Sequence, residues 1–259
     1  KVVTGLRRVG KSTIFDLYIQ ELKKEGISDE QILKINFEDL DNEPLRDKRA
    51  LYSHIIASAK DGKTLYVFLD EIQRVDGFEE VVDSLFIKEN IDVYITGSNA
   101  KFLSSEIATL LTGRYVEINV LPLSFKEYYA HFKDNGKSKR NLFTDYITYG
   151  ALPGIFMFET GTAQQREYIE SVYKTILEKD ILKRNSAASK QLVENILSYL
   201  VYNIGCLTTT KRITDTLNSN GTKVSYNTVD SYFETLQDCF FVYKADRYDV
   251  VGKEYLKLI

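Results

Sequence analysis

Short apolar runs rich in β-branched residues alternate with longer stretches of helical periodicity through the first half of the chain. Runs of the first kind predict buried strands, whereas apolar residues three or four positions apart predict amphipathic helices. Regular alternation of the two predicts a parallel sheet with helices on both faces. The expected strands are 1–4, 32–37, 65–69, 91–96 and 115–120, and the expected helices are 12–25, 45–59, 78–88 and 100–112.

The second half of the chain has a mainly helical pattern. Ser124 and Glu127 have the Ser-x-x-Glu spacing of a capping box, which predicts the start of a helix. Glycine and proline over 150–154 interrupt the pattern, and a long helix is expected over 162–183. Three more helices and two short apolar segments follow, in the order typical of a winged helix-turn-helix domain. The helices are expected over 192–204, 211–217 and 227–240, and the segments 241–243 and 255–258 are expected to pair as a hairpin around Gly252.

These patterns divide the chain into three parts. We expect an α/β core over 1–130, a helical lid or linker over 131–188, and a winged-helix-like domain over 189–259. Lys1 and Ile259 both fall inside expected strands. We therefore interpret the sequence as a piece of a longer protein, truncated at both ends.

Residues 5–12 read Gly-Leu-Arg-Arg-Val-Gly-Lys-Ser, which matches the phosphate-binding pattern G-x-x-x-x-G-K-[ST] between an expected strand and an expected helix. Glycines let several backbone N–H groups converge on one oxyanion, and the helix N-terminus adds partial positive charge. A chance glycine-rich turn is the alternative, but it does not explain the flanking strand and helix. Lys11 is expected to reach the β- and γ-phosphates, and the Ser12 hydroxyl to ligate Mg²⁺. The residues expected to contact the nucleotide are Gly5, Arg7, Arg8, Val9, Gly10, Lys11, Ser12, Thr13 and Ser98.

Two acidic residues follow the apolar strand 65–69. An aspartate at the strand end, Asp70, is placed to face Mg²⁺ through a bound water. Glu71 is placed to orient or deprotonate the water that attacks the γ-phosphate. An exposed acidic pair at a strand end is common by itself. Together with the phosphate-binding loop, however, the pair favours hydrolysis over binding alone.

Polar and basic residues near the next strand supply further candidates. Asn99 or Ser98 is placed to sense the γ-phosphate, although either is also a good helix N-cap. Arg114 follows the expected helix 100–112 and is a candidate for stabilising charge in phosphoryl transfer. A basic residue at a helix C-terminus is also favourable by itself. Arg7 and Arg8 compete for the same role: each can contact phosphate, or reach toward the lid or a neighbouring subunit.

Composition limits the classes of partner. The chain has 259 residues, 44% of them hydrophobic and 27% charged, which indicates a globular protein with a full core. No apolar run approaches the ~20 residues of a membrane span, and the two cysteines suggest reduced residues of a cytoplasmic protein. The histidines and cysteines do not have the spacing of a zinc site. A net charge of −3 gives no overall attraction to nucleic acid.

Charge also disfavours DNA as a partner of the last domain. Its eight basic residues are matched by eight acidic ones over 186–259. Asp230, Glu234 and Asp238 fall on one face of the expected recognition helix, where they would repel phosphates. A protein-interaction or autoregulatory role is therefore favoured for this domain. The sequence leaves homo-oligomerisation open.

ATP is favoured over GTP. The chain lacks the Asn-Lys-x-Asp tetrapeptide of guanine sites, and Gln73 stands where signalling GTPases have glycine. Glu71 and the appended helical modules argue against a small-molecule kinase. The motifs together resemble the prokaryotic AAA-like P-loop ATPases. The resemblance rests on residues 5–12, 69–73, 95–99, 111–114, 122–125, 150–154 and the helix with Lys179 and Asp180.

This resemblance covers nearly the whole chain. It implies a P-loop NTPase core with a five-stranded parallel sheet of order 5-1-4-3-2 and helices on both faces. It also implies a winged-helix segment and commonly a further C-terminal domain of unknown role, which this sequence lacks. By the resemblance, Lys11, Ser12, Asp70 and Glu71 inherit the ATP and Mg²⁺ roles.

The expected function is therefore that of an Mg²⁺-dependent ATPase. Its nucleotide state would control the helical and winged-helix modules, and turnover would depend on an arginine from a partner or another subunit if none acts in cis. The alternative is a winged-helix regulator of DNA or protein binding that holds ATP without appreciable turnover.

Overall fold

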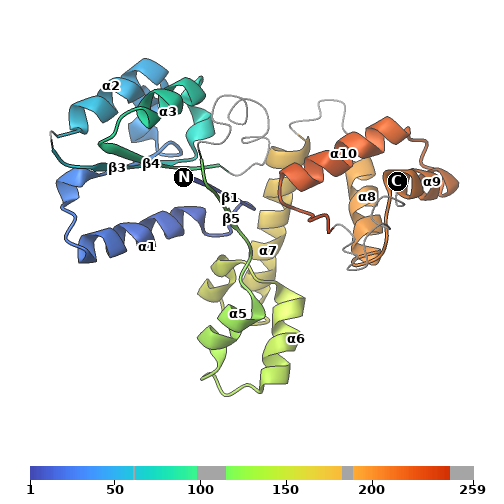
Figure 1. The fold of residues 1–259 in the computed structure, drawn as a ribbon. Coiled ribbons are helices and arrows are strands. Elements are labelled where there is room, and N and C mark those ends of the chain that lie inside the picture. Colours follow the sequence, from blue (N-terminus) through green and yellow to red (C-terminus); the bar gives the residue numbers. More distant parts are fainter. Residues whose placement is uncertain (61, 98–114, 183–188, 246–259) are drawn as a thin grey trace, which may run out of the picture. The chain divides into compact units, whose positions relative to one another are not determined.

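The computed structural model describes residues 1–60, 62–97, 115–182 and 189–245. The chain divides into two compact units, Lys1–Ser189 and Lys190–Ile259, each of which is described by itself. Figure 1 shows the elements of both units along the chain. In the described residues, no helix has the length and apolar character needed to cross a membrane.

The first unit is built on a five-stranded sheet with the order β2-β3-β4-β1-β5. Every pair of neighbouring strands is parallel. Read from the other edge, the order is 5-1-4-3-2, so the expected α/β fold is confirmed. The strands are β1 (Val2–Gly5), β2 (Ile32–Asn36), β3 (Leu65–Asp70), β4 (Ile91–Thr96) and β5 (Glu117–Val120).

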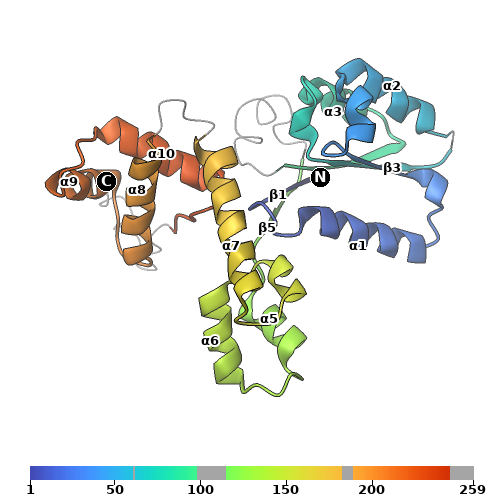
Figure 2. The same cartoon turned by 180° about the vertical axis from the view of Figure 1, so that it is seen from behind.

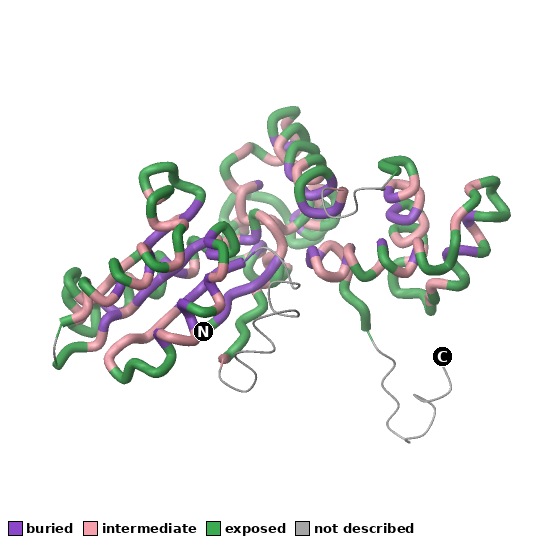
Figure 3. Tube along the Cα trace, turned by 90° about the horizontal axis from the view of Figure 1, so that it is seen from above, coloured by how far each residue is buried: buried purple, intermediate pink, exposed green. Residues whose placement is uncertain are grey.

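Helices cover both faces of this sheet, as Figure 1 and the view from behind in Figure 2 show. On one face lies α1 (Lys11–Lys24), and on the other lie α2 (Lys48–Ser58) and α3 (Phe78–Phe86). Side chains alternate between the two cores along each strand. In β3, Phe68 packs in the core under α1, whereas its neighbours Val67 and Leu69 pack in the core under α2 and α3. Most of β3 is therefore buried. Figure 3 shows the buried parts of the chain in purple.

One helix of the core begins later than its apolar pattern suggests. The expected helix 45–59 is α2, which begins at Lys48 because Asp47 caps it. The Asp47 carboxylate accepts hydrogen bonds from the backbone N–H groups of Arg49 and Ala50. The preceding residues, Leu40–Arg46, form a 3₁₀ helix. The expected helix 100–112 lies outside the described residues.

The helical region that follows the sheet has its own aromatic core. The capping box predicted at Ser124 and Glu127 is present and opens α5. Tyr128, Leu142 and Ile155 form the buried centre of this core. The long helix expected over 162–183 is α-helical over Ala163–Thr175 and continues as a π-helix over Ile176–Ile181. The elements are α5 (Phe125–Phe132), α6 (Lys139–Tyr149), η5 (Pro153–Met157), α7 (Ala163–Thr175) and the π-helix η6 (Ile176–Ile181).

The second unit contains the three expected helices, which are α8 (Lys190–Tyr202), α9 (Thr210–Ser219) and α10 (Tyr226–Asp238). Residues 241–245, which include the first expected hairpin segment, have no strand conformation. The second segment, 255–258, lies outside the described residues. The hairpin, and with it the winged-helix assignment, stays a prediction.

Candidate functional site

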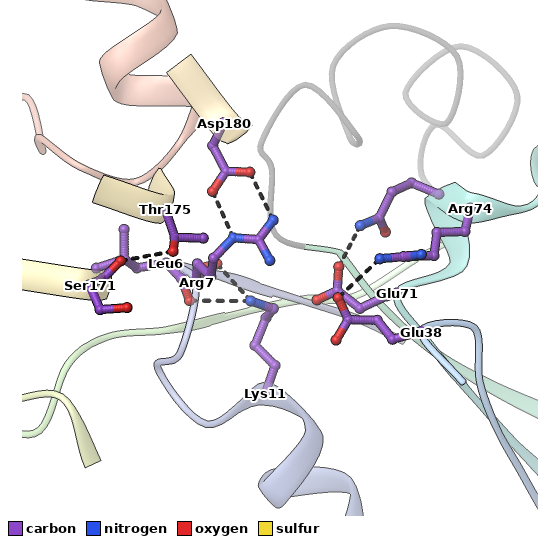
Figure 4. Close-up of polar contacts among 11 residues, drawn as sticks. Leu6, Arg7, Lys11, Glu38, Glu71, Arg74, Ser171, Thr175 and Asp180 are labelled. Atoms are coloured by element: carbon purple, nitrogen blue, oxygen red, sulfur yellow. Dashed lines mark hydrogen bonds and ion pairs between the residues drawn. The ribbon is translucent and has the colours of Figure 1, made fainter. Parts of the chain in front are cut away.

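The phosphate-binding loop leads from β1 into α1 and folds around the ammonium group of Lys11. Lys11 is buried, and its Nζ donates hydrogen bonds to the carbonyl oxygens of Gly5 and Leu6 at 3.0 and 3.2 Å (Figure 4). The backbone takes positive φ at Arg8 (67°) and at Gly10 (104°), which curls the loop. The charged end of the lysine is thereby held against the loop that the sequence assigned to phosphate.

The carboxyl ends of β3 and β4 bring the acidic pair together with a threonine. Asp70, the last residue of β3, is 1% exposed, and Thr96, the last residue of β4, is fully buried. The Thr96 hydroxyl donates to Asp70 Oδ1 at 2.5 Å and accepts a hydrogen bond from the Glu71 backbone N–H at 2.9 Å. One hydroxyl group therefore fixes both acidic residues against the neighbouring strand.

The backbone of Glu71 is left-handed, with φ 54° and ψ 46°. This conformation costs a non-glycine residue about 1–3 kcal/mol and is concentrated at functional sites. Glu71 Oε2 accepts a hydrogen bond from Gln73 Nε2 at 2.5 Å. Among the described non-glycine residues, positive φ occurs at Arg8, Glu71 and Phe240, so two of the three belong to this site. The strained backbone therefore lies in the phosphate-binding loop and directly after β3.

The charges of the site influence one another. Burial lowers the pKa of the Lys11 ammonium, and Glu71 opposes this shift by favouring the charged form. The Asp180 carboxylate raises the pKa of Arg7 through its hydrogen bonds, and Glu71 adds to the effect. An anionic phosphate beside Lys11 would further favour the charged ammonium, because an adjacent opposite charge offsets desolvation.

Arg7 joins the loop to the helical region. Its Nε and Nη2 donate to the two carboxylate oxygens of Asp180 at 2.8 and 2.9 Å (Figure 4). The sequence left Arg7 open between phosphate, the expected lid and a neighbouring subunit, and in the structure Arg7 contacts Asp180 of the helical region. Pro153 in η5 also lies near the loop, since its Cγ would be 3.7 Å from a Cβ atom added to Gly10.

Comparison with known proteins agrees with this geometry. Residues 1–129 match the family model described as an AAA domain. The first part of the chain is an AAA-like P-loop domain. Residues 140–257 match a second model, described as a domain of unknown function. The AAA domain therefore accounts for the sheet and the loop, whereas the helical region beyond it carries no assigned role.

Two curated relatives align with almost the whole AAA-like chain. An uncharacterized protein of Haemophilus influenzae is 35% identical over 261 residues, which cover 99% of this chain and 64% of the relative. An uncharacterized protein of Methanocaldococcus jannaschii is 28% identical over 271 residues, which cover 98% of this chain and 58% of the relative. The chain thus spans less than two thirds of the length of these relatives.

Two solved structures resemble this chain more distantly. The ORC2 protein of Aeropyrum pernix in its ADP form is 15% identical with a TM-score of 0.48, and the match covers 92% of this chain and 78% of that one. Cdc6p of Pyrobaculum aerophilum is 16% identical with a TM-score of 0.41, and the match covers 91% of this chain and 78% of that one.

The residues of the AAA domain fit a magnesium ion bound together with a nucleotide. Within the described ranges, no group of three or more His, Cys, Asp or Glu side chains is arranged to hold a metal. Mg²⁺ instead often uses one or two protein ligands and completes its shell with phosphate and water. Thr96 hydrogen-bonds to only Oδ1 of Asp70, and Ser12 is exposed in the first turn of α1. The Asp70 carboxylate and the Ser12 hydroxyl group would hold the ion.

Three predicted site residues fall outside the described part of the chain: Ser98, Asn99 and Arg114. Their sensing, capping and charge-stabilising roles stay predictions. The other predicted residues lie at the ends of β1 and β3, in the loop, in the first turn of α1 or directly after β3. Of these, Arg8, Ser12 and Thr13 are exposed, whereas Val9 is buried.

Sequence reasoning missed Thr96, Gln73 and Asp180 as parts of the site. Thr96 was treated as the end of a strand, although a hydroxyl residue at the end of the neighbouring strand is a usable indication. Gln73 enters the sequence analysis as evidence against a GTPase and as part of the family motif 69–73, but not as a residue that contacts Glu71. Asp180 lies 173 residues from Arg7, and no local spacing connects two residues so far apart.

Thr96→Val is expected to lower the free energy of unfolding by about 1–3 kcal/mol, because a buried carboxylate loses its donor and the Glu71 N–H loses its acceptor. Valine has nearly the same shape, so the change tests the hydroxyl group alone. Chemical denaturation of the parent, Thr96→Val and Thr96→Ser measures the effect. Thr96→Ser keeps the hydroxyl and is expected to lose less. Equal losses in the two variants would contradict the role given to the hydroxyl.

Proposed function

We propose that this protein is an Mg²⁺-dependent ATP hydrolase whose nucleotide state controls its helical region and its second unit. One observation carries the proposal: the buried Thr96 hydroxyl fixes both Asp70 and Glu71 at the sheet edge where the phosphate-binding loop begins. Parallel sheets place ligand sites at the carboxyl ends of their strands. Binding alone does not require a strained glutamate beside a buried aspartate.

Each group has a separate task in this proposal. Lys11 binds the β- and γ-phosphates, and Ser12 and Asp70 hold Mg²⁺, which neutralises phosphate charge when bound. Glu71 orients a water molecule and accepts its proton as the water oxygen attacks the γ-phosphorus. The bond between the γ-phosphorus and the β–γ bridging oxygen breaks, and ADP leaves with that oxygen.

The identity of the nucleotide rests on the sequence. No guanine-binding tetrapeptide is present, and Gln73 occupies the position where signalling GTPases have glycine. In the structure, Gln73 donates to the Glu71 carboxylate. The amide thus helps to orient the proposed base, a role that glycine cannot supply. We therefore propose ATP as the substrate.

The alternative is a regulator that holds ATP without turning it over. Its second unit has balanced charge, which disfavours duplex DNA and favours a protein partner. Part of the acidic face on α10 is used within this unit, because Asp230 Oδ1 accepts a hydrogen bond from Thr210 of α9 at 2.8 Å. Asp230 therefore has a structural role in addition to any effect on a partner.

Phosphate release by the purified protein tests the proposed function. The parent is expected to release phosphate from ATP only with Mg²⁺, and Lys11→Ala is expected to bind ATP about 10- to 100-fold more weakly, as expected for loss of a charge-assisted hydrogen bond. The matched control is Lys24→Ala, which removes an exposed lysine from the same helix.

This experiment separates the two functions. ATP binding without phosphate release by the parent would contradict the hydrolase and favour the regulator. Equal loss of binding in Lys11→Ala and Lys24→Ala would contradict the assignment of the loop.

A further inference from the structure

The ion pair between Arg7 and Asp180 is the most buried one in which the AAA domain meets the helical region. The Asp180 side chain is 8% exposed and that of Arg7 is 22% exposed. Two parallel hydrogen bonds make the pair bidentate, which fixes the plane of the guanidinium as well as its position. The other ion pairs that the described residues form have more exposed carboxylates.

Asp180 leaves part of the guanidinium available. An arginine has five N–H donors, and Asp180 uses Nε and Nη2. The remaining nitrogen, Nη1, points away from Asp180 and toward the side on which Lys11 lies (Figure 4). The Glu71 carboxylate favours the charged form of both Arg7 and Lys11, although burial lowers the pKa of Lys11 overall. The free edge of Arg7 thus faces the proposed phosphate site.

The pair is better suited to hold Arg7 than to release it. Removing the partner of a buried carboxylate leaves an uncompensated charge in the interior, which is strongly unfavourable. A phosphate that pulled Arg7 away would impose this penalty on Asp180. A phosphate that binds the free edge imposes none, because the two hydrogen bonds to Asp180 persist.

The local structure around Asp180 is also unusual. Asp180 lies in the π-helix η6, which continues α7 over Ile176–Ile181. Short π-helical segments are rare and are found mostly at functional sites. The residues that flank Asp180 on the buried face are apolar: Ile176, Leu177 and Ile181. Asp180 therefore lies among apolar side chains, and Arg7 is a charged partner of its carboxylate.

We propose that Asp180 is a positioning residue, which holds Arg7 so that the free edge of its guanidinium binds the terminal phosphate of a nucleoside triphosphate. Arg7 then distinguishes the triphosphate from the diphosphate, and the helical region contributes to that distinction through Asp180. This inference rests on the nucleotide site of the proposed function, but it does not require turnover.

The ratio of the dissociation constants for ADP and for a non-hydrolysable ATP analogue tests this inference. Asp180→Asn removes the charge and keeps the shape, and it is expected to lower the ratio about tenfold, the size of one charge-assisted hydrogen bond. Arg7→Gln is expected to lower it at least as much, and the double variant no further than Arg7→Gln alone. Glu178→Gln, an exposed carboxylate in the same π-helix, is the control and is expected to leave the ratio unchanged.

A second variant guards against misfolding of Asp180→Asn. Arg7→Lys leaves Asp180 with a charged partner but removes the planar fork, and it is expected to lower the ratio as well. An unchanged ratio in these variants would overturn the inference, even if their melting temperatures fall. Tighter binding of the ATP analogue by Asp180→Asn would also overturn it, because Asp180 would then withhold Arg7 from phosphate.

The two proposals fail in different ways. A parent that binds the ATP analogue more tightly than ADP but releases no phosphate contradicts the hydrolase and leaves the positioning role supported. A parent that hydrolyses ATP, with a ratio that Asp180→Asn does not change, contradicts the positioning role alone. A parent that binds ADP and the analogue equally well contradicts the role given to Arg7.

Discussion

Glu71→Gln is expected to slow phosphate release about 100- to 10,000-fold, the usual contribution of a general base, while ATP binding stays close to that of the parent. An amide has the size of the carboxylate but cannot accept the proton of the attacking water. It also retains an oxygen that can accept the hydrogen bond from Gln73. The backbone hydrogen bond from Glu71 to Thr96 does not depend on the side chain, so the strained turn is expected to persist.

Single-turnover phosphate release and equilibrium ATP binding measure the two parts of this prediction. The control is Glu89→Gln, which removes an exposed carboxylate that lies before β4, at the other end of the strand from Thr96. Turnover equal to that of the parent would show that another group deprotonates the water. Loss of ATP binding together with turnover would show that Glu71 holds the nucleotide or the metal ion.

Gly5→Ala is expected to lower the free energy of unfolding by about 2–5 kcal/mol, as the sum of backbone strain and steric overlap. The φ angle of Gly5 is 141°, a value that residues with a Cβ atom rarely adopt. A Cβ atom at this position would lie 2.4 Å from the carbonyl oxygen of Val120 in β5. Because that oxygen belongs to backbone in the neighbouring strand, the overlap is relieved only if β1 and β5 separate.

Gly26→Ala is the matched control for this prediction. Gly26 also has positive φ, at 90°, but no atom within 4 Å of the added Cβ. Chemical denaturation of both variants separates the cost of the backbone conformation from the cost of the overlap. Gly5→Ala is expected to lose clearly more stability than Gly26→Ala. Equal losses would show that the two strands adjust to the methyl group.

Much of the α/β core is predictable because it depends on residues close together in the sequence. The apolar run 65–69 and the helical spacing over 78–88 correspond to β3 and α3. The start of α2 is less predictable, since the cap at Asp47 outweighs the apolar pattern that begins at residue 45. The π-helix at the end of α7 has no counterpart in the sequence pattern, because the residues that it buries also have the four-residue spacing of an α-helix: Ile176, Leu177, Asp180 and Ile181.

Three features follow from the sequence alone: the strand–loop–helix unit around Lys11, the acidic pair at the end of β3 and the alternation that produces a parallel sheet. These features are local, since each depends on the chemistry and spacing of a few consecutive residues. The contacts of Thr96 with Asp70 and Glu71, and of Arg7 with Asp180, arise from the packing of the folded chain. Those contacts depend on which distant strands and helices pack together, and packing is governed by the burial of whole faces rather than by any short pattern.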